Sequence, residues 1–121
     1  MNAQLMKTLQ LRPVAFHPAL ARVAGGAAAG LFLSQLFYWS DKSSLPGGWI
    51  YKNAGGWHEE TCLTQDEQKT ARKKLRSAGL IEESSLRDLG VNKFSTTKAY
   101  RINFERLHDV GARLKLTSCA R

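Results

Sequence analysis

The feature that most constrains the fold is an apolar run of 17 residues, VAGGAAAGLFLSQLFYW, at positions 23–39. We expect a helix that begins at Pro18, because proline suits the first helical turn, and that ends near Trp39, before a polar loop. The apolar side chains do not keep to one face of this helix, so it must be buried on more than one side. It is therefore the central helix of a domain, or part of it meets another chain, and a homodimer through residues 18–39 stays open.

Small residues occupy the first half of this run, from Ala24 to Gly30. Each glycine lowers helix propensity by up to about 1 kcal/mol. Small side chains also let a neighbouring backbone approach closely, and the segment is therefore a candidate for tight helix packing.

The run is short for a membrane span, which needs about 20 predominantly apolar residues. It contains Ser34 and Gln35, and the charged residues Arg22 and Asp41 flank it. A secretory signal ends in small residues at a cleavage site, whereas this run ends in bulky aromatics. The sequence predicts no membrane partner and a cytoplasmic location.

Length and charge narrow the class of protein further. The chain has 121 residues, enough for one domain with its own core. Hydrophobic residues make up 43% and there are two cysteines, which excludes a wholly disordered chain and a disulfide-held scaffold. Eighteen Lys and Arg residues against ten Asp and Glu residues give a net charge of +8. A small domain this basic indicates a polyanionic partner, with nucleic acid first.

Three regions are expected along the chain. Residues 1–12 show weak periodicity and are interpreted as a flexible or loosely docked lead. Residues 13–110 form the domain. Residues 111–121 have no clear pattern and are interpreted as a tail.

A short strand and a short helix follow the apolar helix. Residues 48–52 alternate as a strand does. Asn53 is a good N-cap for a helix that ends near Thr61, and a tight turn follows at Cys62 and Leu63.

The clearest helix start in the chain is at Thr64. The Thr64 hydroxyl can accept from the Glu67 amide while the Glu67 carboxylate reaches back to the Thr64 amide, which is a capping box. Gly79 suits a left-handed end to this helix. Residues 69–76 contain five basic residues and no acidic one. Such a run is compatible with a solvated face that complements the helix dipole, and also with an anion-binding face.

A β-hairpin is predicted after the basic helix. Its strands are residues 80–84 and 98–104, joined by a turn-prone polar loop at 87–97, and a short helix follows from Glu105 to about Val110. One face of the second strand would carry Tyr100, Ile102 and Phe104. The predicted class is α+β, mainly helical, with the element order of a winged helix-turn-helix: a long N-terminal apolar helix and a C-terminal β-hairpin wing.

Three motifs in this region are similar to those of a known family. They are GWIYK at 48–52, Trp57-x-Glu59-Glu60-Thr61-x-Leu63-Thr64, and Glu67-Gln68-x-x-Ala71-Arg72-x-x-Leu75-x-x-x-Gly79-Leu80. With them the chain resembles, over about residues 13–107, winged-helix proteins of bacterial phages and mobile elements. Many of these are replication initiators or replisome organisers, and others are regulators, so the resemblance implies a replication or transcription role. Two departures are Cys62, where such domains usually have glycine, and the pair Gly55-Gly56 in place of better helix formers.

The same element order points to candidate DNA-binding residues. If the helix after Thr64 enters a major groove, its exposed early positions meet base edges and its flanks meet phosphates. The base-facing candidates are Gln65, Asp66, Lys69, Thr70 and Lys73. The phosphate-facing candidates are Arg72, Lys74 and Arg76, and the wing candidates are Arg87, Lys93 and Lys98. The leading prediction is sequence-selective binding of double-stranded DNA in a bacterial cytoplasm, with association with the nucleoid left open.

A second class of function stays open. The same fold can be a small protein-interaction factor that binds a host or replisome protein, for example a phage-encoded inhibitor. The over-apolar first helix and the aromatics near Trp39 and Trp49 favour this alternative.

An enzyme, a metal site and a cofactor are not expected. The segment His58-Glu59-Glu60-Thr61-Cys62 resembles a zinc-protease helix with cysteine in place of the second histidine. No third ligand is evident beside it, and no glycine-rich phosphate loop occurs. We therefore predict a binding protein with neither catalytic residues nor cofactor.

Overall fold

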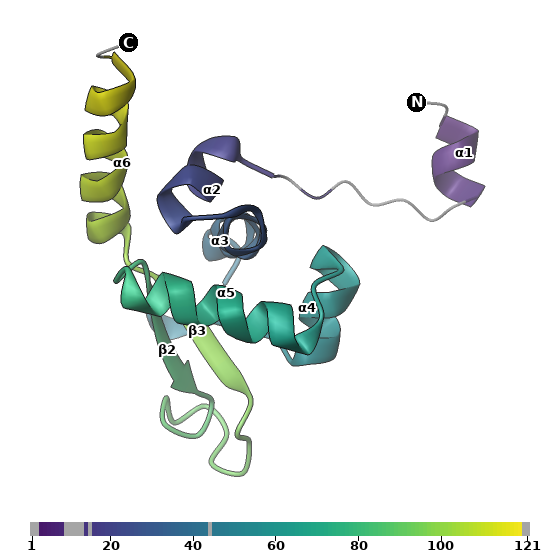
Figure 1. The fold of residues 1–121 in the computed structure, drawn as a ribbon. Helices are drawn as coiled ribbons and strands as arrows, with labels where there is room; N and C mark the ends of the chain where they lie inside the picture. The colour runs from purple at the N-terminus through teal and green to yellow at the C-terminus, as the bar shows by residue number, and fades with distance from the viewer. Residues whose placement is uncertain (1–2, 9–13, 15, 44, 120–121) are drawn as a thin grey trace.

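The computed structural model describes residues 3–8, 14, 16–43 and 45–119. The fold is α+β and mostly helical, with one antiparallel sheet (Figure 1). The elements in chain order are α1 (Ala3–Thr8), α2 (Pro18–Ala24), α3 (Ala27–Ser40), the 3₁₀ turn η1 (Pro46–Gly48), β1 (Ile50–Tyr51), α4 (Ala54–Thr61), α5 (Gln65–Ser77), β2 (Ile81–Ser85), β3 (Lys98–Ile102) and α6 (Phe104–Cys119). Helix α1 stands apart from the other elements in Figure 1 and falls within the segment predicted as a lead.

The predicted single helix from Pro18 to Trp39 is wrong, because the chain breaks between α2 and α3. Gly25 lies in the left-handed region with a φ of 88° and ends α2. The two helices are bent by 117° at this break. Glycine takes this conformation without steric cost, so the pair Gly25-Gly26 acts as a hinge that folds α2 back onto α3.

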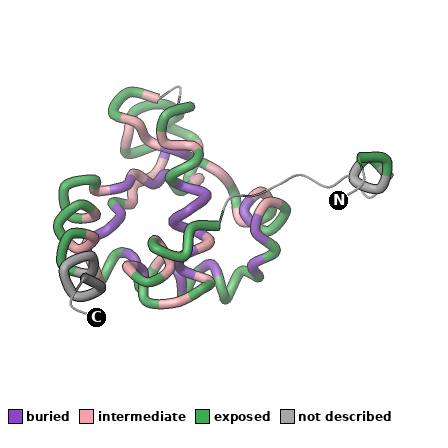
Figure 2. Tube along the Cα trace, turned by 90° about the horizontal axis from the view of Figure 1, so that it is seen from above, coloured by how far each residue is buried: buried purple, intermediate pink, exposed green. Residues whose placement is uncertain are grey.

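Helix α3 is the central helix of the fold, as its all-round apolar pattern predicts. The side chains of Phe32, Leu33 and Leu36 are fully buried. In Figure 2 the buried segments of the trace gather in the interior, with exposed segments around them. Phe32 packs on Trp57 of α4 with ring centroids 4.4 Å apart, and on Tyr100 of β3 at 5.7 Å. Burial of such large side chains supplies most of the apolar stabilisation of a small domain. The predicted homodimer through residues 18–39 stays a prediction.

The sheet has the order β1–β3–β2, and both pairings are antiparallel. In β3, Tyr100 pairs with Ile50 on one side and with Glu83 on the other. Strand β1 is shorter than the predicted 48–52, but Ile50 is buried and Tyr51 exposed, as the alternation predicts.

Two predictions at the C-terminal end are wrong. Phe104 does not share a strand face with Tyr100, since the strand ends at Ile102 and Phe104 begins α6 with half of its surface exposed. Helix α6 also does not stop near Val110, and it runs through most of the predicted tail at 111–121. Leu107 and Val110 hold its first turns against the core.

Among the described residues, no single helix is both long and apolar enough to cross a membrane. Helices α2 and α3 pass that test only as a pair, across the bend described above. The element order and the sheet order together are compatible with a winged helix.

Candidate nucleic-acid interface

The angle between α4 and α5 is set by a turn with dense hydrogen bonding. The Asn53 side chain accepts from the Gly56 amide at 2.8 Å, so the predicted N-cap is confirmed despite the glycine pair in α4. Cys62 ends α4 in the left-handed conformation, with a φ of 61°. The Gln68 side chain, fully buried, donates to the carbonyls of Ala54 at 3.0 Å and Leu63 at 2.9 Å. Sequence reasoning missed Gln68, because a glutamine in a polar helix has no signal for burial.

Helix α5 begins with the predicted capping box. The Glu67 amide donates to the Thr64 hydroxyl at 3.2 Å, and the Thr64 amide donates to the Glu67 carboxylate at 3.0 Å. The hydrogen bond from the Thr64 backbone is the main reason that the pKa of Glu67 lies below its usual value. Gly79, with a φ of 74°, follows the helix in the left-handed conformation, as predicted.

One face of α5 points into the core and the opposite face points to solvent. Gln68, Ala71 and Leu75 are buried, at the i, i+3 and i+7 positions of one stripe. Lys69 and Lys73 lie one turn apart on the other side and are exposed, as are Gln65, Asp66 and Thr70. The outward face of α5 therefore presents the ammonium groups of Lys69 and Lys73, the hydroxyl of Thr70 and the carboxylate of Asp66.

The flanking cations of α5 contact the rest of the molecule. The Arg72 guanidinium lies 5.9 Å from the centroid of the Tyr100 ring. Arg76 pairs with Glu83 of β2 at 2.5 Å, and the Lys74 ammonium lies 3.5 Å from the Gly25 carbonyl. These contacts hold α5 against the sheet and α2, and they reduce the charge that the flanks offer to a ligand.

The hairpin loop, residues 86–97, carries further exposed cations. Arg87 and Lys93 are exposed, and no ion pair involves them among the described residues. Lys98, at the start of β3, lies 4.0 Å from Glu83 and shares that carboxylate with Arg76. Of the eleven candidate DNA-contacting residues, four cations have charged groups that make no ion pair, hydrogen bond or ring contact with another element in the described part of the chain: Lys69, Lys73, Arg87 and Lys93. We call these four the free-cation set.

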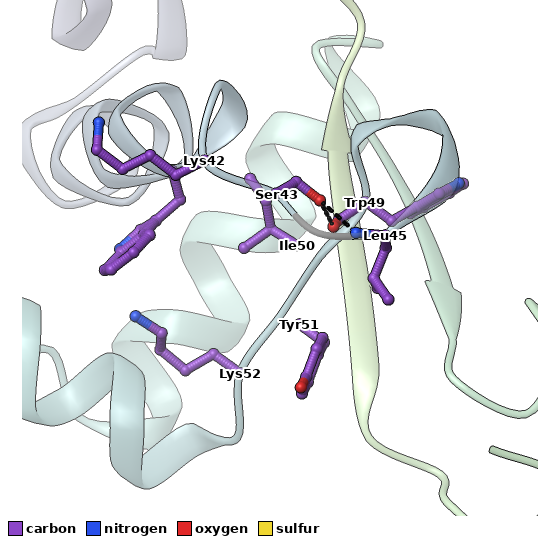
Figure 3. A pocket seen from close by; sticks show the side chains of 8 residues that line it. Lys42, Ser43, Leu45, Trp49, Ile50, Tyr51 and Lys52 are labelled. Atoms are coloured by element: carbon purple, nitrogen blue, oxygen red, sulfur yellow. Dashed lines mark hydrogen bonds between the residues drawn. The ribbon is translucent and has the colours of Figure 1, made fainter. Parts of the chain in front are cut away.

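A pocket lies away from this face, between the end of α3 and β1. Its volume is about 230 Å³. Its lining comes from the end of α3, the loop that follows it, and β1 with its neighbours (Figure 3): Trp39, Lys42, Ser43, Leu45, Trp49, Ile50, Tyr51 and Lys52. The Ser43 hydroxyl donates to the Trp49 carbonyl and closes the loop over the strand.

A charged junction shares Trp39 and Lys52 with the lining of this pocket. The Glu60 carboxylate accepts from Gln35 at 2.6 Å and from the Trp39 indole at 2.8 Å, and it pairs with Lys52. The Lys52 ammonium also lies over the rings of Trp39, at 4.6 Å, and Trp57, at 5.2 Å. Sequence reasoning placed Glu60 in a motif but missed this role, because its partners are 21 and 25 residues away.

The zinc-like segment at 58–62 has no metal-binding geometry in the described structure. No group of three or more His, Cys, Asp or Glu residues is close enough to hold an ion within the described ranges. The His58 ring instead contacts the Leu63 carbonyl at 3.0 Å, and Cys62 is a free, exposed thiol.

Comparison of the chain with protein-family models, with curated proteins and with solved structures finds no match.

Proposed function

We propose that the chain is a winged-helix protein that binds double-stranded DNA with sequence selectivity, as part of the replication or transcription control of a phage or mobile element. In this proposal α5 is the recognition helix and the β2–β3 hairpin is the wing. The observation that carries it is the free-cation set, which places unpaired positive charge on the outward face of α5 and on the hairpin beside it.

The basic residues of α5 fall into two groups, one that contacts the rest of the protein and one that projects into solvent, and this arrangement supports binding in a groove. Arg72 and Arg76 contact the sheet, so the helix is held rigidly by its flanks while Lys69 and Lys73 project away from the core. A rigid helix with long polar side chains on its outer face fits the width of the major groove. Gln65 and Thr70 beside these lysines supply side chains that can hydrogen-bond base edges.

Salt dependence of duplex binding tests the proposal. The affinity for a fluorescein-labelled duplex of about 30 base pairs can be measured by fluorescence anisotropy. We expect this affinity to fall by at least tenfold between about 50 and 200 mM salt, because lysines that bind phosphates release counterions from the DNA. The double variant Lys69→Ala/Lys73→Ala should bind more weakly and lower the salt slope by about two.

The matched control is Lys7→Ala/Lys42→Ala, which removes the same charge from exposed positions on α1 and after α3. It should keep most of the affinity. Binding that does not weaken with salt, or an equal loss in both double variants, contradicts a site on α5.

A second candidate function, binding of a protein partner, is favoured by the pocket between α3 and β1. Aromatic walls from Trp39, Trp49 and Tyr51 fit a peptide with bulky apolar side chains. Selection from a displayed peptide library should enrich such sequences, and Tyr51→Ala should abolish the enrichment. A library that yields no peptide, or peptides that bind Tyr51→Ala equally, rejects this candidate.

A further inference from the structure

The most exposed large apolar side chain among the described residues is Phe94, at the tip of the β2–β3 hairpin. Its surface is 86% exposed, whereas the other exposed large apolar residues lie between 44% and 50%. Single exposed apolar side chains are common on protein surfaces, so what Phe94 can bind is judged from the backbone that holds it and from the charges beside it.

The backbone of the tip is hydrogen-bonded, which fixes where Phe94 stands. The Phe94 amide donates to the Asn92 side chain at 3.0 Å, and the Ser95 amide donates to the Asn92 carbonyl at 3.1 Å. The amides of Val91 and Asn92 both donate to the carbonyl of Leu86, whose side chain is buried. The loop is thereby tied to the core, and Phe94 is presented outward by this bonding pattern.

The hairpin loop carries two cations, of which Lys93 contacts the Phe94 ring. The Lys93 ammonium lies 5.2 Å from the centroid of the Phe94 ring. The Arg87 amide donates to the Ser95 carbonyl at 3.1 Å, so the Arg87 backbone lies opposite the residue that follows Phe94. Asp88 is the acidic residue of this loop and is exposed. An aromatic ring beside lysine and arginine matches a ligand that offers phosphates next to stacked rings, which is nucleic acid.

The position of the tip relative to α5 is fixed as well. The contact between Arg76 and Glu83 joins the last turn of α5 to β2, and Figure 1 shows the hairpin extending beyond α5 on one side. With α5 in a major groove, a hairpin anchored to its C-terminal end faces the neighbouring stretch of the duplex, where the minor groove opens.

We propose that Phe94 is a wedge that enters the minor groove and unstacks a base step, with Lys93 and Arg87 bound to the flanking phosphates, so that the protein bends the DNA it binds. This inference rests on the proposed DNA binding and adds a deformation step to it. Apolar side chains inserted in this way kink a duplex by about 20–90°.

Energy transfer between dyes on the two ends of a duplex of about 30 base pairs tests the wedge. The native protein should raise the transfer efficiency on saturation. Phe94→Ala should still bind in the anisotropy assay, about tenfold more weakly because one base stack is lost, and should leave the duplex unbent. Phe94→Trp, which keeps an aromatic ring, should preserve the bend.

Val91→Ala is the matched control, since Val91 is an exposed apolar side chain on the same tip. It should bend DNA as the native protein does. Native protein that binds without bending, or Phe94→Ala that bends equally, overturns the wedge while DNA binding stands. Absence of any duplex binding by the native protein overturns both. Phe94-dependent sedimentation with anionic phosphatidylserine vesicles, with no effect of Phe94→Ala on DNA, assigns the ring to a lipid surface and also overturns the wedge.

Discussion

At the scale of single residues, Cys62 occupies a position that suits glycine. Among the described residues it is the one non-glycine side chain with a positive φ, at 61°. The Cβ atom of an L-residue crowds the following carbonyl in this conformation, which costs roughly 1–2 kcal/mol. The bonds around the turn, including the one from the Cys62 amide to the His58 carbonyl at 2.7 Å, maintain the conformation against that cost.

Replacement Cys62→Gly should raise the free energy of unfolding by about 0.5–1 kcal/mol, because relief of the crowding exceeds the extra entropy of glycine in the unfolded chain. Urea unfolding followed by circular dichroism measures the change. Cys62→Ser keeps a Cβ atom and should show no such gain. A glycine variant that is less stable than the native protein would contradict strain at this turn.

At the scale of elements, the packing of α2 on α3 depends on a glycine. A Cβ atom placed on Gly30 would clash with the backbone and side chain of Ala21. The hinge at Gly25 makes this approach possible by turning α2 back along α3. Small residues in the apolar run thus serve contact between two helices of the same chain.

Gly30→Ala should lower the free energy of unfolding by about 1–2 kcal/mol, since overpacking outweighs the gain in helix propensity. Gly111→Ala is its counterpart in α6, where a new Cβ atom meets nothing within 4 Å. That substitution should stabilise the protein by about 0.5–1 kcal/mol. Thermal unfolding of the two variants side by side measures both effects, and equal shifts of the same sign would rule out close packing at Gly30.

At the scale of the whole molecule, Glu60 joins segments that are distant in the sequence. Its carboxylate holds Gln35 and Trp39 of α3 and Lys52 beside β1, while Glu60 itself belongs to α4. The side chains of Glu60 and Lys52 are only 22% and 19% exposed. Loss of one partner would leave the other charge half-buried and unpaired.

Glu60→Ala should therefore destabilise the fold by about 2–3 kcal/mol, as expected for charge-assisted hydrogen bonds that are partly shielded from water. Glu59→Ala removes an exposed carboxylate from the same helix turn and should change stability by less than about 0.5 kcal/mol. Urea midpoints of both variants give the comparison. Similar midpoints would show that the junction adds little to stability.

Much of the fold and of the candidate site was accessible from local sequence signals. The caps at Asn53 and Thr64, the left-handed glycine at 79 and the strand containing Tyr100 and Ile102 depend on groups within a few residues of one another. The all-round apolar pattern of α3 also predicted a central helix, because a helix that is apolar on every side must be buried, whichever elements pack against it. These features depend on residues that are close together in the sequence, so they can be predicted without knowledge of the tertiary fold.

The remaining features depended on contacts between distant segments. A glycine pair inside an apolar run is compatible with both a continuous helix and a hinge. The hinge forms because it lets α2 pack against α3, and that packing stabilises the fold. Likewise, the sequence placed cations along α5 and the hairpin, but Glu83 of β2 engages Arg76 and Lys98 and leaves Lys69 and Lys73 unpaired. Charge content is a property of the chain, whereas the availability of each charge depends on which side chains folding brings within a few ångströms of it.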